Sequence, residues 1–460
     1  MDIHVVILAA GKGTRMKSAR PKVLHCVAGQ PLIEHVLACA AAVQPRTTTV
    51  VVGHQADTLT AALAVHPNLT FVVQEPQLGT AHALLTTEGA LNGQVGILIL
   101  LSGDVPLLTA GTLHRLVDRH QTAGAAATIV TAVVEEPHGY GRIVRHGEQI
   151  ARIVEEKDAS PAERTIREIN SGIYAFSLEG LFDTVRSIAA ENAQREYYLP
   201  DLVAIYRQRG STVATVTVSN PDEIRGINSR IELAAVSRIV RDRKNAELMA
   251  FGVTIEDPAT AYVDAGVTVG ADTILHPGVA LEGTTTIGSS CDIHSGARIV
   301  DSRIGDRVTI LDHCVITHST IDDDVSVGPF AHLRNGAELR AKAKVGNFVE
   351  LKKTVLGPGS KASHLAYLGD ATIGAKVNIG AGTITCNYDG VNKNQTVIED
   401  GAFIGSDSQL IAPLTIGKGA YVGSGSTIRE DVPAGALAIT AGKQRNIDGW
   451  VADRKDRGST

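Results

Sequence analysis

The chain contains 460 residues, of which 44% are hydrophobic and 20% are charged, and its formal net charge is −6. This composition indicates a soluble globular protein of about two to four domains. It excludes the basic surface of a nucleic-acid-binding protein and the apolar spans of a membrane protein. The first residues carry no basic and apolar export segment, and the five cysteines are scattered without zinc-ligand spacing. We therefore expect reduced thiols and a cytoplasmic protein.

Residues 1–228 are predicted to form an α/β domain. Apolar runs at 3–8, 48–52, 71–73 and 95–101 alternate with helical stretches near 32–42, near 59 and from 80. This alternation is typical of a parallel sheet that helices cover on both faces. Ligands of such sheets bind beyond the carboxyl ends of the strands, so the loops that directly follow strands are the candidate site.

The loop after the first strand, residues 8–16, reads LAAGKGTRM. It matches neither the Walker loop nor the dinucleotide fingerprint. A glycine-rich turn that carries Lys12 and Arg15 at the start of a helix suits a di- or triphosphate. The residues alone leave open an ordinary tight turn with two surface cations.

A second candidate loop follows the five consecutive aliphatic residues 97–101, which predict a strand buried on both faces. Asp104 lies just beyond its carboxyl end. A carboxylate there could hold Mg²⁺ against a triphosphate, although a lone aspartate after a strand is also a common turn residue.

Residues 8–16, together with Pro21 and Lys22, resemble the signature of sugar-1-phosphate nucleotidyltransferases. The resemblance implies a Rossmann-like domain with Mg²⁺ held by Asp104 and Asn228, phosphates near Arg15 and Lys22, and a uracil read by Gln74, Gly79 and Thr80. Ser102 stands where that family often has tyrosine. Thr80 could also be a helix N-cap, a role compatible with binding, and Asn228 could instead be the N-cap of the helix that follows it. The residues implied to bind UTP or UDP-N-acetylglucosamine are Leu8, Ala9, Ala10, Gly11, Arg15, Lys22, Gln74, Gly79, Thr80, Ser102, Gly103, Asp104, Gly141, Glu155, Asn170, Tyr198 and Asn228.

Residues 229–251 are predicted to form a helical linker. The stretch 229–250 lacks glycine and proline and spaces its aliphatic residues at helical intervals. One helix of this length is roughly 33 Å long and would act as a stiff connector.

Residues 252–460 are predicted to form a parallel β-helix. From Val269 to Ile428 an aliphatic residue returns about every sixth position, often followed by glycine, with an interruption at 386–397. This hexapeptide period is neither helical nor that of an ordinary strand. The inward aliphatic residues would build a core without aromatics, which make up only 4% of the chain.

Several polar residues fall beside this register instead of on it, among them His364 and Tyr367. Taken alone, such a histidine is usually a surface residue. However, residues 363–370, 377–382 and 386–390, in order with the N-terminal motifs, resemble the family of bifunctional N-acetylglucosamine-1-phosphate uridyltransferases and glucosamine-1-phosphate acetyltransferases. That resemblance implies a left-handed β-helix and assigns His364 as the general base of acetyl transfer. It implies that Arg334, Lys352, Tyr367 and Asn378 bind glucosamine-1-phosphate, and that Ala381, Asn387, Tyr388, Ser406 and Ser424 bind acetyl-CoA.

The resemblance implies one enzyme for two steps of UDP-N-acetylglucosamine synthesis, with acetyl-CoA and UTP as co-substrates. It also implies a homotrimer with shared acetyltransferase sites, supplying cell-wall and envelope polymers. Ala441 stands where the family places an arginine for the coenzyme phosphate, and Lys443 or Arg445 could replace it. One alternative is a nucleotidyltransferase whose β-helix is only structural or regulatory, and another is a non-enzymatic scaffold that binds sugar nucleotides.

Overall fold

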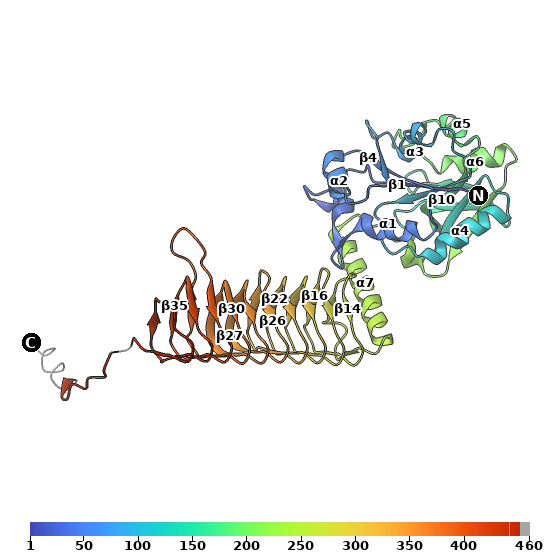
Figure 1. The fold of residues 1–460 in the computed structure, drawn as a ribbon. Coiled ribbons are helices and arrows are strands. Elements are labelled where there is room, and N and C mark those ends of the chain that lie inside the picture. Colours follow the sequence, from blue (N-terminus) through green and yellow to red (C-terminus); the bar gives the residue numbers. More distant parts are fainter. Residues whose placement is uncertain (441, 451–460) are drawn as a thin grey trace, which may run out of the picture. The chain divides into compact units, whose positions relative to one another are not determined.

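The computed structural model describes residues 1–440 and 442–450, and Figure 1 shows its elements. Ala441 and the charged tail 451–460 lie outside the described residues. The chain divides into two compact units, Met1–Val240 and Arg241–Thr460. The division falls inside helix α7 (Arg230–Ala250). The domain boundaries at 228 and 251 stay predictions.

A mixed sheet forms the centre of the first unit, with strand order β11-β7-β10-β6-β1-β4-β5. Its strands are β1 (Ile3–Leu8), β4 (Thr47–Val52), β5 (Leu69–Val73), β6 (Ile97–Ser102), β7 (Ala127–Val133), β10 (Glu168–Ser177) and β11 (Val213–Val218). β1 runs parallel to β4 and β6, so Leu8 and Ser102 end side by side. The four strands expected from the sequence, β1, β4, β5 and β6, run parallel as expected, and β10, which was not among them, runs antiparallel to β6 and β7. A hairpin of β8 (Arg142–His146) and β9 (Gln149–Val154) extends from β10.

Helices cover both faces of this sheet. They are α1 (Leu32–Ala41), α2 (Ala56–Ala62), α3 (Thr80–Leu85), α4 (Ala110–Thr122), α5 (Leu181–Arg186) and α6 (Asp201–Gln208). Consecutive residues of a strand point to opposite faces, so Ile7 packs with Ile33 and Leu116 in one core. Val6 belongs to the other core, with Leu84 and Leu181. The expected covering of both faces is confirmed.

A buried histidine in α4 makes the stability of this unit sensitive to acid. His120 is 2% exposed, and its ring nitrogens lie 3.0 Å from Thr128 Oγ1 and 3.2 Å from Ser177 Oγ. Burial lowers the pKa of His120 to about 4. Its stabilising contribution is therefore complete above pH 6.5, the ordinary histidine value, and is lost as the pH falls toward 4.

We expect His120→Gln to remove this pH dependence. Relative to the variant, the wild type should lose roughly 2–3 kcal/mol of unfolding free energy between pH 7 and pH 4.5. Urea unfolding of the first unit within the full chain measures this difference. His114→Gln changes an exposed histidine of the same helix and is the matched control. Equal acid sensitivity of His120→Gln and wild type would show that another group causes the effect.

Helix α7 begins with a capping box that Ser229 and Glu232 form. Ser229 Oγ accepts from the Glu232 amide at 3.2 Å, and the Glu232 carboxylate accepts from the Ser229 amide at 2.8 Å. The alternative that Asn228 is the N-cap is therefore wrong, and its side chain is available for another role.

No helix in the described part of the chain is long and apolar enough to cross a membrane.

The second unit is a parallel β-helix of short strands from β12 (Thr254–Ile255) to β39 (Leu437–Ala438). Figure 1 shows its stacked coils. The strands pair in parallel, and the residues of the six-residue register, such as Ile310, Leu333 and Leu351, are fully buried. The structure adds a second buried column two positions earlier, filled by small residues such as Thr273 and Cys291. Residues two apart share a face of a strand, so both columns point inward.

The interruption of the repeat is a loop between β32 (Ile384–Cys386) and β33 (Thr396–Ile398). It projects from the coils in Figure 1. The repeat resumes beyond it, because Thr385 pairs with Leu410 as if no loop intervened.

Candidate active sites

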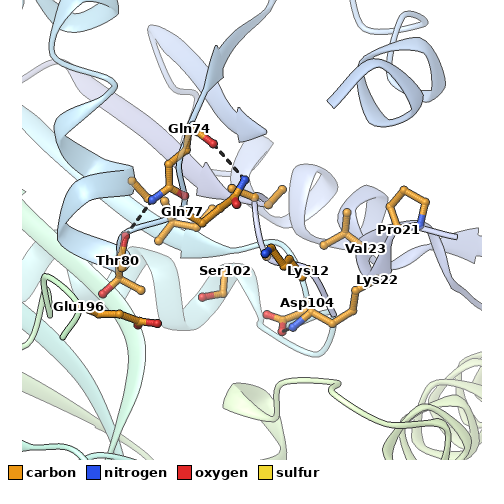
Figure 2. Close-up of a pocket in the computed structure, with 16 residues that line it drawn as sticks. Lys12, Pro21, Lys22, Val23, Gln74, Gln77, Thr80, Ser102, Asp104 and Glu196 are labelled. Atoms are coloured by element: carbon orange, nitrogen blue, oxygen red, sulfur yellow. Dashed lines mark hydrogen bonds and ion pairs between the residues drawn. The ribbon is translucent and has the colours of Figure 1, made fainter. Parts of the chain in front are cut away.

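A cavity of about 470 Å³ opens at the carboxyl ends of β1 and β6. Figure 2 shows the residues around it. Ten residues expected in the nucleotide site line it, namely Leu8, Ala9, Ala10, Gly11, Lys22, Gln74, Gly79, Thr80, Ser102 and Asp104. The wall also contains Lys12, Pro21, Val23, Gln77, Ala83 and Glu196.

Glycine in the first loop lets the cation Lys22 approach the end of β1. Gly13 has a φ of 59°, and a Cβ there would lie 2.8 Å from Cβ of Lys22. Any other residue at position 13 would therefore push Lys22 away from the loop. The alternative that this loop is an ordinary tight turn does not exclude a binding site, because the turn itself forms one wall of the cavity.

Lys22, Asp104 and Asn228 meet beside this loop. The Lys22 ammonium donates to Asp104 Oδ2 and, at 3.2 Å, to Asn228 Oδ1. The backbone joins the same segments, since the Ile227 amide donates to the Asp104 carbonyl at 3.0 Å. Two side-chain oxygens therefore converge on one positive charge, although their residues are far apart in the sequence.

The opposite wall of the cavity contains the residues expected to contact the uracil base. Gln74 is buried, and its Nε2 donates to the Gly79 carbonyl at 3.0 Å, which leaves its Oε1 for a ligand. Gly79 has a φ of 111°, and a Cβ there would lie 2.6 Å from the Tyr197 carbonyl. Thr80 is not the N-cap of α3, because Gly79 occupies that position. Thr80 Oγ1 instead accepts from the Leu199 amide at 3.1 Å.

The residues expected on the sugar gather in a neighbouring cluster. A Cβ at Gly141 would lie 3.2 Å from Glu155 Oε1, and the Asn170 amide donates to the Gly141 carbonyl at 2.8 Å. Burial, together with the charges of Asp158 and Asp201, raises the pKa of Glu155.

Tyr198 belongs to the same surroundings. Its hydroxyl is buried and has no hydrogen-bond partner within the described residues. Burial, together with the charges of Asp158 and Glu155, raises the pKa of Tyr198 to about 12. The tyrosine is therefore neutral and has an unused hydrogen-bonding group.

On the β-helix, His364 lies on β29 (Lys361–Gly369) and is exposed, away from the aliphatic core. It pairs in register with Asn347 on β27 (Lys344–Lys352), and its Nδ1 lies 2.7 Å from Asn347 Oδ1. The amide oxygen can only accept, so Nδ1 donates and Nε2 carries the lone pair. In this tautomer Nε2 is free to accept a proton.

Two cations occupy consecutive coils next to this strand. Arg334 pairs in register with Lys352. The Arg334 guanidinium binds Glu350 at 2.6 Å, and Lys352 Nζ donates to Asp370 Oδ2 at 2.8 Å. Burial opposes the effect, but hydrogen bonds from Lys352 and Asn387 hold the pKa of Asp370 below its usual range. The expected phosphate-binding residues thus lie together, each with a carboxylate partner.

The residues expected at acetyl-CoA continue along the corner of the β-helix that carries His364. β29 pairs with β31 (Asn378–Ile379), β31 with β34 (Phe403–Ile404) and β34 with β37 (Tyr421–Val422). Counting from these pairs places His364, Ala381, Ser406 and Ser424 at equivalent positions of successive coils. The register therefore brings His364 into line with three of the residues expected at acetyl-CoA.

Other residues of the β-helix that are expected to bind substrates lie around Gly369 or in the projecting loop. A Cβ at Gly369 would lie 2.4 Å from the Tyr367 hydroxyl and 2.7 Å from Asn387 Nδ2. Tyr388 lies in the projecting loop, and its hydroxyl donates to the Gly390 carbonyl at 2.6 Å. Asn378 pairs with Lys361 at the other end of β29, apart from this group.

Comparisons with known proteins found family matches in both units of the chain. The model of the MobA-like NTP transferase domain matches residues 5–170, and that of the bacterial transferase hexapeptide (six repeats) matches residues 395–430. The bifunctional protein GlmU of Trichlorobacter lovleyi is 50% identical over 98% of this chain and 99% of that protein. The bifunctional protein GlmU of Pelobacter propionicus is 49% identical over 98% of each chain. This chain belongs to the GlmU family.

Among solved structures, a putative glucose-1-phosphate thymidylyltransferase from Bacillus anthracis is 19% identical, with a TM-score of 0.43. The match covers 52% of this chain and 96% of that one. Membership of the GlmU family confirms the expected family, the bifunctional enzyme and the fold class, a Rossmann-like domain followed by a left-handed parallel β-helix.

The structure places the remaining expected residues outside the cavity wall. Asn228 reaches the site through Lys22, and Gly141, Glu155, Asn170 and Tyr198 form the neighbouring cluster. Gly103 supports the end of β1, since its amide donates to the Leu8 carbonyl at 3.0 Å. Arg15 is exposed on the short 3₁₀ helix Thr14–Met16 and does not line the cavity.

Sequence reasoning missed several residues of both sites. Gln77 and Glu196 line the cavity, and each lies two residues before an expected residue, Gly79 and Tyr198 respectively. Asn347, Glu350 and Asp370 hold His364, Arg334 and Lys352. The 17 residues between paired positions of β27 and β29 lead from His364 to Asn347, whereas Lys352 pairs with Gly369, one residue before Asp370.

Proposed function

We propose that the first unit transfers a uridylyl group from UTP to N-acetylglucosamine-1-phosphate, and that the β-helix first makes this sugar phosphate by acetylating glucosamine-1-phosphate. The observation that carries the proposal is the presence of both sets of residues in one member of the GlmU family: Lys22, Asp104 and Asn228 in one unit, and His364 with its cationic neighbours in the other.

In the uridylyl transfer, a phosphate oxygen of the sugar attacks the α-phosphorus of UTP and pyrophosphate leaves. The reaction needs positioning and charge neutralisation more than a protein nucleophile. Gln74 would meet the uracil through its available Oε1, and the loop amides with Lys12 and Lys22 would bind the phosphates.

The donor set beside the loop fits Mg²⁺, because Asp104 and Asn228 present oxygens that already converge on an ammonium. When bound, Mg²⁺ would neutralise the charge of the triphosphate and of the departing pyrophosphate. Lys22 would then turn from these oxygens to the phosphates.

In the acetyl transfer, the amine of glucosamine-1-phosphate attacks the thioester carbonyl of acetyl-CoA. Nε2 of His364 takes the amine proton as the C–N bond forms, the C–S bond breaks, and the departing thiolate receives the proton from Nε2 to leave as a thiol. Arg334 and Lys352 would hold the sugar phosphate, with Tyr367 and Asn378 on the sugar. Ala381, Asn387, Tyr388, Ser406 and Ser424 would hold the coenzyme.

Three of these residues, Tyr388, Ser406 and Ser424, are exposed, which supports a site completed by a neighbouring subunit of a homotrimer. All five cysteines are unpaired, which supports a reducing, cytoplasmic location. The product, UDP-N-acetylglucosamine, would supply cell-wall and envelope polymers.

Thiol release from acetyl-CoA in the presence of glucosamine-1-phosphate tests the proposal. We expect purified protein to release thiol only when the sugar phosphate is present, and then to form pyrophosphate when UTP and Mg²⁺ are added. Pyrophosphate formation from supplied N-acetylglucosamine-1-phosphate without any thiol release would favour the alternative, a nucleotidyltransferase with a structural β-helix.

A further inference from the structure

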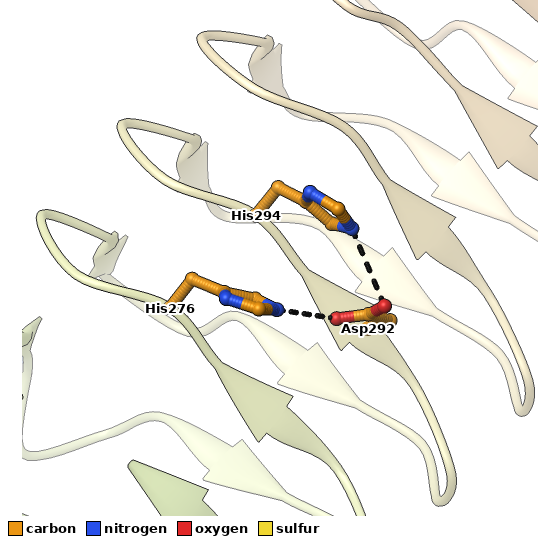
Figure 3. Close-up of side chains that lie close together, drawn as sticks. All are labelled: His276, Asp292 and His294. Carbon is orange, nitrogen blue, oxygen red and sulfur yellow. Dashed lines mark hydrogen bonds and ion pairs between the residues drawn. The ribbon is translucent and has the colours of Figure 1, made fainter. Parts of the chain in front are cut away.

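A group of three metal-ligand side chains, His276, Asp292 and His294, lies on the first coils of the β-helix, outside both proposed active sites. β15 (Ile274–Leu275) pairs in register with β18 (Asp292–Ile293), so His276 and His294 follow equivalent positions of two successive coils. Their rings face one another with centroids 4.7 Å apart. Figure 3 shows the Asp292 carboxylate against both rings.

The facing atoms of the three side chains are close enough to share one ion. Nε2 of His276 lies 2.8 Å from Asp292 Oδ1, and Nε2 of His294 lies 3.3 Å from Asp292 Oδ2. One ligand atom from each residue lies within 4.8 Å of the other two. Tetrahedral ligands at about 2.1 Å from a zinc ion lie about 3.4 Å apart, so shifts of about 1 Å or less would close the site.

A further carboxylate lies beside the outer nitrogen of each ring, and the one beside His276 is within hydrogen-bond distance. Nδ1 of His276 lies 3.0 Å from Glu256 Oε2, and Nδ1 of His294 lies 3.5 Å from Asp312 Oδ2. A carboxylate on the outer nitrogen is the usual support of a metal-bound histidine, because it fixes the proton on Nδ1 and makes Nε2 a better donor of its lone pair. Both histidines are thus arranged to present Nε2 to the same point.

The partial burial of the three residues also suits a bound ion. The side chains of His276, His294 and Asp292 are 25%, 29% and 42% exposed, so an ion could enter from solvent. Another histidine of the β-helix, His318, has one carboxylate beside it, with its Nδ1 3.9 Å from Asp301 Oδ2. It belongs to no group of three metal-ligand side chains among the described residues.

We propose that His276, His294 and Asp292 bind one divalent transition-metal ion, of which Zn²⁺ has the best-matched chemistry, with water as the remaining ligand. Two imidazole nitrogens and a carboxylate oxygen suit Zn²⁺ better than Mg²⁺ or Ca²⁺, which prefer oxygen ligands. The ion cross-links two successive coils and stabilises the start of the β-helix.

Calorimetric titration of the full-length protein with Zn²⁺, in an excess of Mg²⁺ that occupies the Asp104 site, tests this proposal. We expect one Zn²⁺ per chain at this site in the wild type and in His318→Gln. Binding should weaken at least 10-fold in His276→Gln and in His294→Gln. Circular dichroism and uridylyl transfer verify that each variant is folded.

Substitution with Co²⁺ and thermal unfolding supply independent readouts. The wild type should show the visible absorption of a tetrahedral nitrogen and oxygen site without a thiolate band, and this absorption should be lost in the two variants. Zn²⁺ should raise the unfolding temperature of the wild type and of His318→Gln only. The proposal would be overturned if the wild type bound no Zn²⁺ or if both His276→Gln and His294→Gln bound Zn²⁺ as tightly as the wild type. A Co²⁺ thiolate band retained by both variants would also overturn it.

Discussion

Replacement of Asp104 by alanine is expected to reduce uridylyl transfer by roughly 10³-fold or more, because several kcal/mol of charge stabilisation would be lost from the phosphate site. The Asp104 carboxylate is one of two side-chain oxygens on the Lys22 ammonium, so its loss removes the negative group that would hold Mg²⁺. Acetyl transfer should continue at the wild-type rate. Separate assays of pyrophosphate formation and thiol release measure the two effects.

Asp104→Asn distinguishes a metal ligand from a support for Lys22. The amide keeps an oxygen that can accept from Lys22 but loses the charge, so we expect uridylyl transfer to remain low and to recover partly at high Mg²⁺ concentration. Asp118→Ala, which changes an exposed aspartate of α4, is the matched control and should be fully active. Full activity of Asp104→Asn at ordinary Mg²⁺ concentration would show that Asp104 only positions Lys22.

Replacement of His364 by alanine should lower acetyl transfer by roughly 10²–10⁴-fold, the usual effect of losing a general base. The amine proton would then have to pass to water. Uridylyl transfer from supplied N-acetylglucosamine-1-phosphate should be unchanged, because His364 belongs to the other unit. Single-substrate assays with acetyl-CoA in excess measure the loss in turnover, and unchanged acetylation would refute the mechanism.

Asn347 offers a finer test of the same site. Its side-chain oxygen accepts from Nδ1 of His364, so Asn347→Ala should reduce turnover less than His364→Ala and should shift the pH profile of acetylation. Asn347→Asp restores an acceptor and should recover most of the rate. His318→Ala, which removes another exposed histidine of the β-helix, controls for general effects of removing an imidazole. An unchanged pH profile in Asn347→Ala would mean that the asparagine has no positioning role.

Much of the fold could be predicted from the sequence, because its signals are local. An aliphatic residue at every sixth position must be buried to be stable, and residues such as Ile310 and Leu333 are fully buried as expected. The strand at Ile97–Ser102 was visible as a run of aliphatics for the same reason. The antiparallel β10 was not visible, since strand direction depends on distant pairing partners and leaves little trace in composition.

The sites were only partly predictable. Motif resemblance supplied Asp104, Asn228 and His364, but it did not show that Lys22 lies between the first two. The sequence also left open that Asn228 and Thr80 are the N-caps of the helices that follow them. The structure excludes both caps, because Ser229 and Gly79 occupy those positions.

The sequence by itself determined the six-residue coil and the strand-end positions of the glycine-rich loop and Asp104, since hydrophobic spacing and backbone restrictions act over a few residues. Only the tertiary structure decided which polar groups meet. Lys22 reaches Asn228 across more than two hundred residues, and the His276 and His294 rings face one another because two coils stack in register. Such contacts depend on strand order and coil length summed over the whole chain, and no local pattern encodes that sum.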